Sequence, residues 1–330
     1  MRTKQRGEAS DVEVALICAL PLEANAILSL FEEHWTRGLA RASDQYSYSF
    51  GVLGGCNVVL AHPSGMGKVK AANIAAACAV TFTNIKLALV VGVCGAAPHT
   101  ETKGDIMLGD VIISKGVFQY DFGRRFPDYF QQKSPLKEPN ARIGSLLAKA
   151  EADFHRSELE NKISQTLSDM ETAGAQIYPN EDDRLFLSSY RHKHQEHVDC
   201  TLCATCVTDE DAVCKDATES GCNEIGCDPT NLVQRSRCNV KNQPAVQFGY
   251  VASGDTVVKS GSYRDRIIQE CKVIGFEMEG AAVWDVFPAV VIIKGACDYA
   301  DSHKNKLWQN YAAATAAACA KAFLQLWQDP

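Results

Sequence analysis

Short runs of apolar residues recur along the chain, and most of them end at a glycine or at a charged residue. Continuous, partly β-branched runs predict buried strands over residues 12–19, 87–93, 110–114, 246–252, 272–276 and 289–293. Residues 46–52 alternate well enough for a strand, and the Gly54-Gly55 turn joins them to a further predicted strand over 58–62. Apolar periodicity and alanine-rich composition predict helices over 22–33, 69–81, 280–286 and 308–327.

Buried strands that alternate with helices are typical of an α/β fold. We therefore predict a three-layer αβα sandwich around a central mixed, largely parallel sheet. Residues 1–10 are polar and predict a disordered tail, and residues 11–330 predict a single domain. Within that domain, residues 131–243 are polar, cysteine-rich and only patchily periodic, so we interpret them as an insertion of helices and loops.

Composition narrows the class of function. The 330 residues carry a net charge of -7, which argues against a protein that coats nucleic acid, since such a protein needs a basic surface. No run is long and apolar enough to span a membrane, and residues 1–10 lack a signal peptide's apolar core. We expect a cytoplasmic protein with no membrane partner, in which most of the 14 cysteines are reduced thiols.

Three carboxylates stand where α/β enzymes place functional groups. Glu23 follows the first predicted strand, Glu279 lies in Phe276-Glu-Met-Glu279, and Asp298 follows the apolar run 289–293. Each of them alone is equally well explained as a carboxylate that stabilises the first turn of a helix.

Six separated motifs, taken in order, resemble the nucleoside phosphorylase and nucleosidase superfamily, which includes purine nucleoside phosphorylase and methylthioadenosine/S-adenosylhomocysteine nucleosidase. The resemblance covers about residues 12–125 and 245–328, and the stretch from Cys297 to Lys306 is most similar to the phosphorylase-like domains of fungal NLR-type immune proteins. The motifs are Gly65-Met-Gly-Lys-Val69, Gly92-Val-Cys-Gly95, Gly104-Asp-Ile-Met-Leu-Gly-Asp-Val111, Ser253-Gly-Asp255, Phe276-Glu-Met-Glu279 and Cys297-Asp298.

The resemblance implies a role for each matched residue. Asp298 would protonate N7 of a purine as the glycosidic bond breaks, and Glu279 would hold the ribose hydroxyls. It further implies that Met66 and Met278 contact the ribose, and that the base is flanked by Val93, Cys94, Gly95, Val257 and Val258. No cofactor is implied, and a homo-oligomer is expected.

Glu23 favours hydrolysis over phosphorolysis. It matches the glutamate that activates water in the nucleosidase branch, and a carboxylate is a poor neighbour for a phosphate nucleophile. Phosphorolysis stays an alternative. So does a ligand-sensing module without turnover, because the nucleosidase pattern has serine where this chain has Val93.

The predicted small-molecule partner is adenosine or an adenine nucleotide, with ATP as the most specific form of the prediction. Basic residues near the matched motifs would suit a phosphate tail, although a solvated charge cluster explains them equally well. These residues are Arg124, Arg125, His303, Lys304 and Lys306.

Seven cysteines between residues 200 and 238 form a separate group in the insertion. Cys200, Cys203 and Cys206 have pairwise spacings typical of zinc ligands, and His192, His194 and His197 lie nearby. Structural zinc is one interpretation, and free thiols or inducible disulfides are the other. A catalytic metal is not expected, because the predicted chemistry needs none.

Overall fold

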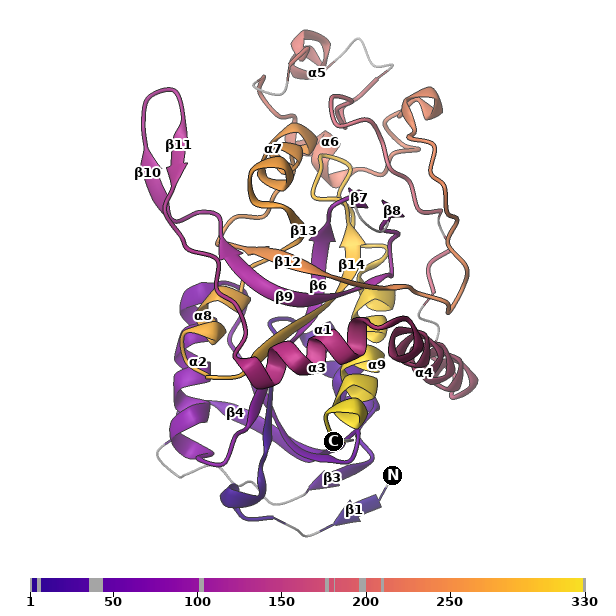
Figure 1. Ribbon diagram of the computed structural model, residues 1–330. Coiled ribbons are helices and arrows are strands. Elements are labelled where there is room, and N and C mark those ends of the chain that lie inside the picture. Colours follow the sequence, from indigo (N-terminus) through magenta and orange to yellow (C-terminus); the bar gives the residue numbers. More distant parts are fainter. Residues whose placement is uncertain are drawn as a thin grey trace.

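The computed structural model describes residues 2–4, 7–35, 44–100, 104–175, 178–180, 182–195, 200–208 and 211–328, which form a mixed sheet between helices (Figure 1). Over the described residues, the strands of this sheet are β1 Arg2–Lys4, β2 Val14–Ile17, β3 Glu33–Trp35, β4 Ser47–Leu53, β5 Cys56–His62, β6 Leu87–Ala96, β9 Val111–Gln119, β12 Val246–Ser253, β13 Val273–Glu277 and β14 Val290–Asp298. Their order in the sheet is β1-β3-β4-β5-β2-β6-β13-β12-β9-β14. Parallel pairs join β2 to β5 and β6, β12 to β9 and β13, β6 to β14, and β1 to β3.

One end of this sheet closes on itself. Strand β6 pairs with β2 and β13, and it pairs with β14 as well, so β6, β13, β12, β9 and β14 form a ring. The ring brings the ends of β6, β13 and β14 together, although these strands are separated by up to two hundred residues of sequence.

Helices cover both faces of the sheet, as the alternating side chains of β2 show. Val14 and Leu16 pack in one core with α1 (Pro21–Ser29) and α9 (Gln309–Gln328), whereas Ala15 and Ile17 pack in a second core with α2 (Lys68–Thr81) and α8 (Gly280–Trp284). Because a strand points successive side chains to opposite faces, this pattern requires a helical layer on each side. The predicted three-layer α/β fold is thus confirmed.

The segment 131–243 divides into two parts. Its helices α3 (Ala141–Glu151) and α4 (Asp153–Thr172) bury apolar side chains in the same core as α9. In the described residues after α4, the helices are short: α5 (Thr201–Thr205), α6 (Lys215–Glu219) and η2 (Pro229–Asn231). Helices α5 and α6 lie with α7 (Gly261–Cys271) near the top of Figure 1. The cysteines of the predicted insertion belong to this second part.

Smaller elements complete the chain. They are the 3-10 helix η1 (Ala9–Asp11) and two short ribbons, β7 (His99–Thr100) with β8 (Gly104–Asp105) and β10 (Gly123–Arg125) with β11 (Phe130–Gln132). Strand β1 lies where the sequence predicts a disordered tail, and it pairs with β3. Among the described residues, no helix is both long and apolar enough to cross a membrane.

Candidate active site

A cavity of about 180 Å³ lies where β2, β6, β13 and β14 end, and we call it the central cavity. Functional groups of α/β proteins gather at the carboxyl ends of parallel strands, because the loops that follow those strands meet there. All ten residues predicted for catalysis, ribose binding or base binding line it: Glu23, Met66, Val93, Cys94, Gly95, Val257, Val258, Met278, Glu279 and Asp298.

Glu23 is held in place by backbone donors. Its Oε2 accepts hydrogen bonds from the N–H groups of Ala19 and Leu20, and its Oε1 accepts one from Val93, each at 2.8 Å. A carboxylate can accept about four such bonds, so one position remains for a further donor such as water. Burial raises the pKa of Glu23, while the nearby Lys294 ammonium and the backbone donors act in the opposite direction. A fixed carboxylate with a raised pKa is suited to accept a proton.

Glycine at position 92 makes room for this carboxylate. A Cβ atom added to Gly92 would lie 2.1 Å from Oε1 and 2.4 Å from Cδ of Glu23. Gly92 therefore fixes where the carboxyl group can lie, and it does so through the missing side chain rather than through an unusual backbone conformation.

Glu279 shares a buried network with Lys294. Its Oε1 accepts a hydrogen bond of 3.2 Å from the backbone N–H of Gly67, and its Oε2 accepts one of 3.2 Å from Lys294 Nζ. Lys294 is 1% exposed. Burial works against its charged form, but the carboxylates of Glu279, Glu23 and Glu277 together outweigh burial and raise the Lys294 pKa. Lys294 is not among the residues predicted for the site, although a lone lysine after an apolar run is a signal, since a buried charge must be paired.

Asp298 lies at the end of β14 and is 4% exposed. Its Oδ1 accepts a hydrogen bond of 2.9 Å from the backbone N–H of Ala300, and the Sγ of Cys297 donates to Oδ2 over 3.1 Å. Lys304 Nζ also donates to Oδ2. Burial opposes the charge on Lys304, but its neighbours, with Asp298 foremost, together outweigh burial and raise the Lys304 pKa. Asp298 and Lys304 thus form an ion pair at the wall of the cavity.

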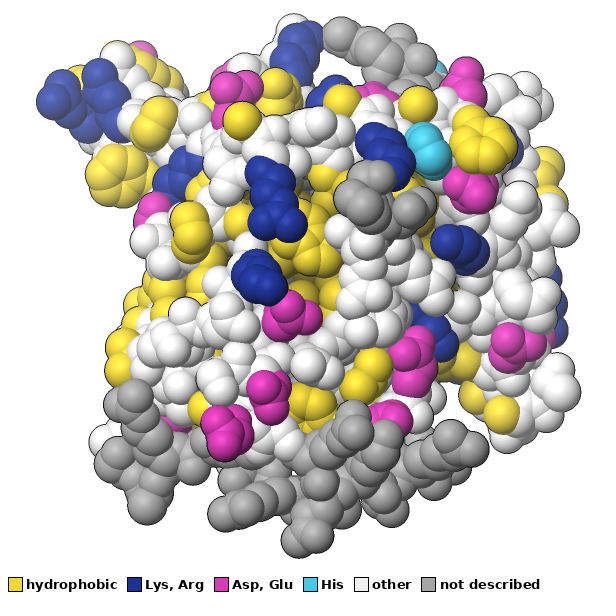
Figure 2. Space-filling view, turned by 60° about the horizontal axis from the view of Figure 1, so that its bottom comes forward, with side chains coloured by type: hydrophobic (Ala, Val, Ile, Leu, Met, Phe, Trp, Pro, Cys, Tyr) yellow, Lys and Arg dark blue, Asp and Glu magenta, His cyan; other side chains and the backbone are white. Residues whose placement is uncertain are grey.

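Four of the five residues predicted to bind phosphate do not line the central cavity. Arg124 and Arg125 are exposed on β10, which together with β11 projects from the body of the molecule in Figure 1. Figure 2 shows Lys and Arg side chains gathered on a projecting lobe at the upper left. Lys306 is exposed, and His303 is buried, with a pKa lowered to about 3 by burial and by His192. Lys304 alone lines the cavity, and it faces Asp298.

Comparison with known proteins places this geometry in context. A family model described as the phosphorylase superfamily matches residues 13–177, which is half of the chain. A nucleotide-binding leucine-rich repeat (NLR)-like protein of Hyaloscypha variabilis is 32% identical over 321 residues, which is 95% of this chain. The chain spans only 29% of the length of that relative.

Solved structures share the fold at low sequence identity. The 5′-methylthioadenosine/S-adenosylhomocysteine nucleosidase of Streptococcus pneumoniae, bound to a transition-state inhibitor, has a TM-score of 0.55 and 17% identity, covering 96% of this chain and all of that one. The enzyme of the same name from Neisseria meningitidis has a TM-score of 0.53 and 18% identity, covering 95% and 98%. Futalosine hydrolase of Helicobacter pylori has a TM-score of 0.52 and 18% identity, covering 95% and 97%.

Proposed function

The chain belongs to the phosphorylase superfamily, and we propose that it is a purine nucleosidase, an enzyme that uses water to cleave the N-glycosidic bond of a purine nucleoside. One observation carries the proposal: Glu23, from near the start of the chain, and Glu279 and Asp298, from near its end, all line one cavity and are all buried. Glu277 is a fourth buried carboxylate in the same wall. Buried carboxylates in one cavity are costly unless they serve a function, since each must be held against desolvation.

Each carboxylate has a separate step in the proposed reaction. Glu23 takes a proton from water as the water oxygen bonds to C1′ of the ribose. The C1′–N9 bond breaks and its electron pair moves into the purine, which takes up a proton at N7 from the Asp298–Lys304 pair. Glu279 accepts hydrogen bonds from the ribose hydroxyls, and its charge stabilises the oxocarbenium-like transition state.

The charges at the cavity support water over phosphate as the nucleophile. Among the described residues that line the central cavity, the only cationic side chain is Lys304, and it is paired with Asp298. A phosphate ion needs arginines or a helix N-terminus beside it, whereas Glu23 would repel a phosphate. Phosphorolysis is therefore the second candidate.

The substrate class is a finer proposal. The exposed part of the cavity wall is apolar, since Met66 and Val257 are 47% and 43% exposed there. Arg124, Arg125 and Lys306 are outside the cavity, so no unpaired cation in its described wall is available for a phosphate tail. This arrangement supports adenosine or another unphosphorylated purine nucleoside ahead of ATP.

Chromatography of the products tests the proposal. The protein is incubated with adenosine, guanosine, inosine, methylthioadenosine, AMP and ATP, each with and without inorganic phosphate, and free base is quantified. We expect base release that does not depend on phosphate and is fastest with an adenine nucleoside. Binding of these compounds without any base release would instead support the sensing module.

A further inference from the structure

Histidine and cysteine side chains of the insertion gather in two groups. The inner cluster consists of His194, Cys200, Cys203 and Cys214, whose ligand atoms all lie within 4.8 Å of one another. The outer cluster consists of His192, Cys222 and Cys227 together with His303, which comes from the loop after β14. Along the sequence, the residues of the outer cluster enclose those of the inner cluster.

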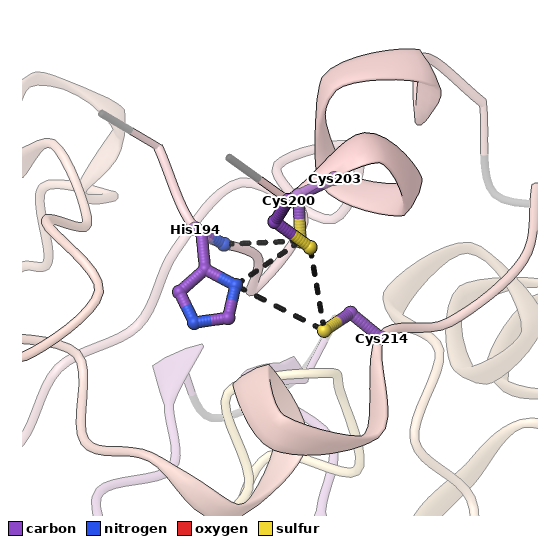
Figure 3. A group of neighbouring side chains, drawn as sticks. All are labelled: His194, Cys200, Cys203 and Cys214. Atoms are coloured by element: carbon purple, nitrogen blue, oxygen red, sulfur yellow. Dashed lines mark hydrogen bonds between the residues drawn. The ribbon is translucent and has the colours of Figure 1, made fainter. Parts of the chain in front are cut away.

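The side chains of the inner cluster point toward one another, and the distances between their ligand atoms suit a tetrahedral metal site (Figure 3). Cys200 Sγ and Cys214 Sγ are 3.7 Å apart, and His194 Nδ1 is 3.4 Å from Cys203 Sγ and 3.9 Å from Cys214 Sγ. Bond lengths of about 2.3 Å for Zn–S and about 2.05 Å for Zn–N, at tetrahedral angles, place two sulfurs about 3.8 Å apart and a sulfur about 3.6 Å from a nitrogen. A disulfide would need the two sulfurs about 2.05 Å apart, so the Cys200–Cys214 separation fits a shared ion far better.

The backbone supports the same cluster. The N–H of His194 donates to Cys203 Sγ over 3.4 Å, and Lys193 Nζ donates to the carbonyl oxygens of Cys203 and Cys206. Hydrogen bonds to a thiolate ligand fix its orientation and stabilise its charge, as outer-shell groups do at metal sites. These contacts hold the loop of Cys200 and Cys203 against the histidine.

The outer cluster carries an independent sign of a missing ligand. His303 is 8% exposed, and neither of its ring nitrogens has a hydrogen-bond partner. Two unsatisfied buried nitrogens are costly, and a bound ion would satisfy one of them. His303 stacks on Phe186 at 4.2 Å between ring centroids, which fixes the plane of its ring.

The geometry around His192 fits an ion as well. Its Nδ1 lies 3.5 Å from Cys227 Sγ and 3.8 Å from Cys222 Sγ, close to the separation expected for a nitrogen and a sulfur on one zinc. Its Nε2 is 2.9 Å from the carbonyl oxygen of Ser220. A ring N–H that donates to a carbonyl leaves the other nitrogen free to bind a metal, which is the usual arrangement of a histidine ligand.

We propose that this part of the chain binds two Zn²⁺ ions, one in the inner cluster through three thiolates and one imidazole, and one in the outer cluster through two thiolates and two imidazoles. Both ligand sets are those of structural zinc, which takes four nitrogen or sulfur ligands and leaves no open position for catalysis. The second part of the insertion has short helices and few buried apolar side chains, so metal binding would supply folding energy that its core lacks.

The outer ion would also join the insertion to the active site. His303 is adjacent to Lys304, the partner of Asp298. A second cavity of about 280 Å³ has His192, Cys222 and His303 in its wall and shares Asp298 and Lys304 with the central cavity. Zinc at the outer cluster therefore fixes the loop that follows Asp298.

Metal analysis of the whole chain tests the proposal without any assay of activity. The protein is expressed in medium that contains zinc and purified without chelator. Its zinc content is then measured by inductively coupled plasma mass spectrometry. We expect two zinc ions per chain in the natural sequence, one in the C200S/C203S variant and one in the C222S/C227S variant. Cys238→Ser is the matched control, because Cys238 is an exposed cysteine of the same insertion outside both clusters, and it should keep both ions.

The proposal is overturned if the natural protein holds less than about 0.3 zinc per chain after zinc reconstitution. The outer site alone is overturned if the natural protein holds one zinc per chain and only the C200S/C203S variant loses it. X-ray absorption at the zinc edge of the natural protein avoids variants that fail to fold. With both sites filled, the average shell should hold about 2.5 sulfur and about 1.5 nitrogen neighbours at roughly 2.3 and 2.05 Å. A shell of oxygen and nitrogen alone would overturn both sites.

Discussion

Substitution of Gly92 by alanine should displace the proposed base without touching substrate. The added Cβ atom would lie 2.1 Å from Oε1, 2.4 Å from Cδ and 2.9 Å from Oε2 of Glu23. Non-bonded carbon and oxygen atoms do not approach this closely, so the carboxyl group must retreat by about 1 Å. Its hydrogen bond from the neighbouring Val93 N–H, now 2.8 Å long, would be lost or distorted.

The size of the effect follows from what Glu23 contributes. A positioned general base contributes about 10²–10⁴-fold to the rate, and a misplacement of about 1 Å can cost about 10²-fold. We therefore expect kcat for base release to fall by about 10²-fold or more in Gly92→Ala. Overpacking of this kind costs about 1–3 kcal/mol of stability, so the variant should still fold.

A double-mutant cycle on base release shows whether the loss acts through Glu23. Glu23→Gln removes the base and should lose about 10²–10⁴-fold, and G92A/E23Q should be no slower than E23Q alone. Gly144→Ala is the matched control, because a Cβ atom at this position of α3 has no neighbour within 4 Å. If Gly92→Ala keeps its rate within about threefold, or if the two losses multiply, Gly92 does not act through Glu23. An E23Q rate within about threefold of the natural rate would exclude Glu23 as the base.

Further changes in the same cavity have distinct expected outcomes. Asp298→Asn should lower kcat by about 10²–10⁴-fold in the base-release assay with the melting temperature retained, and an unchanged kcat would exclude the Asp298–Lys304 pair as the source of the N7 proton. Glu279→Gln should lower kcat/KM by about 10–10²-fold through weaker hydrogen bonds to the ribose, whereas an unchanged value would show that Glu279 does not hold the sugar. Lys294→Met should cost about 3–5 kcal/mol of unfolding free energy in urea titrations, because it leaves buried carboxylates without their cation. The pKa values of Glu23 and Glu277 are raised in the folded state, so that state binds more protons than the unfolded state and loses stability as pH rises. The loss of unfolding free energy in Lys294→Met should therefore be larger at about pH 8 than at about pH 5. The reverse order would refute this assignment of charges. R124A/R125A should leave adenosine cleavage unchanged, and a loss beyond about threefold would place the β10–β11 hairpin at the active site.

The sequence predicted the strands of the sheet well because their side chains are buried on both faces. The strand predicted from residue 289, with its end near Cys297-Asp298, corresponds to β14, although its continuous apolar run stops at residue 293. Lys294 interrupts the apolar pattern there, and only the fold shows that carboxylates from other strands neutralise it. The polar helix α7 was not predicted, because few of its residues are apolar; its start is fixed by Ser260, whose side chain accepts a hydrogen bond from Tyr263 N–H.

The sequence predicted the site residues that belong to motifs at the ends of strands. It did not predict which basic residues lie at the site, because their charge alone does not say where they lie in the fold. Asp298 is the last residue of β14, and Glu279 and Glu23 follow the ends of β13 and β2, so the topology of the sheet was enough to bring them together. Arg124 and Arg125 follow a strand as well, but a hairpin carries them outward. The pairing of Lys304 with Asp298 depends on how the loop between β14 and α9 folds back, which spacing alone does not specify.

One measurement tests the proposed function most directly. The purified protein is incubated with adenosine, once in buffer free of phosphate and once with added phosphate, and the base and sugar products are separated by chromatography. The proposed hydrolase would release adenine and free ribose at the same rate in both buffers. Adenine formed only when phosphate is present, together with ribose 1-phosphate, would contradict hydrolysis. No adenine under either condition, or with the other purine nucleosides and nucleotides of the panel, would contradict an enzyme altogether.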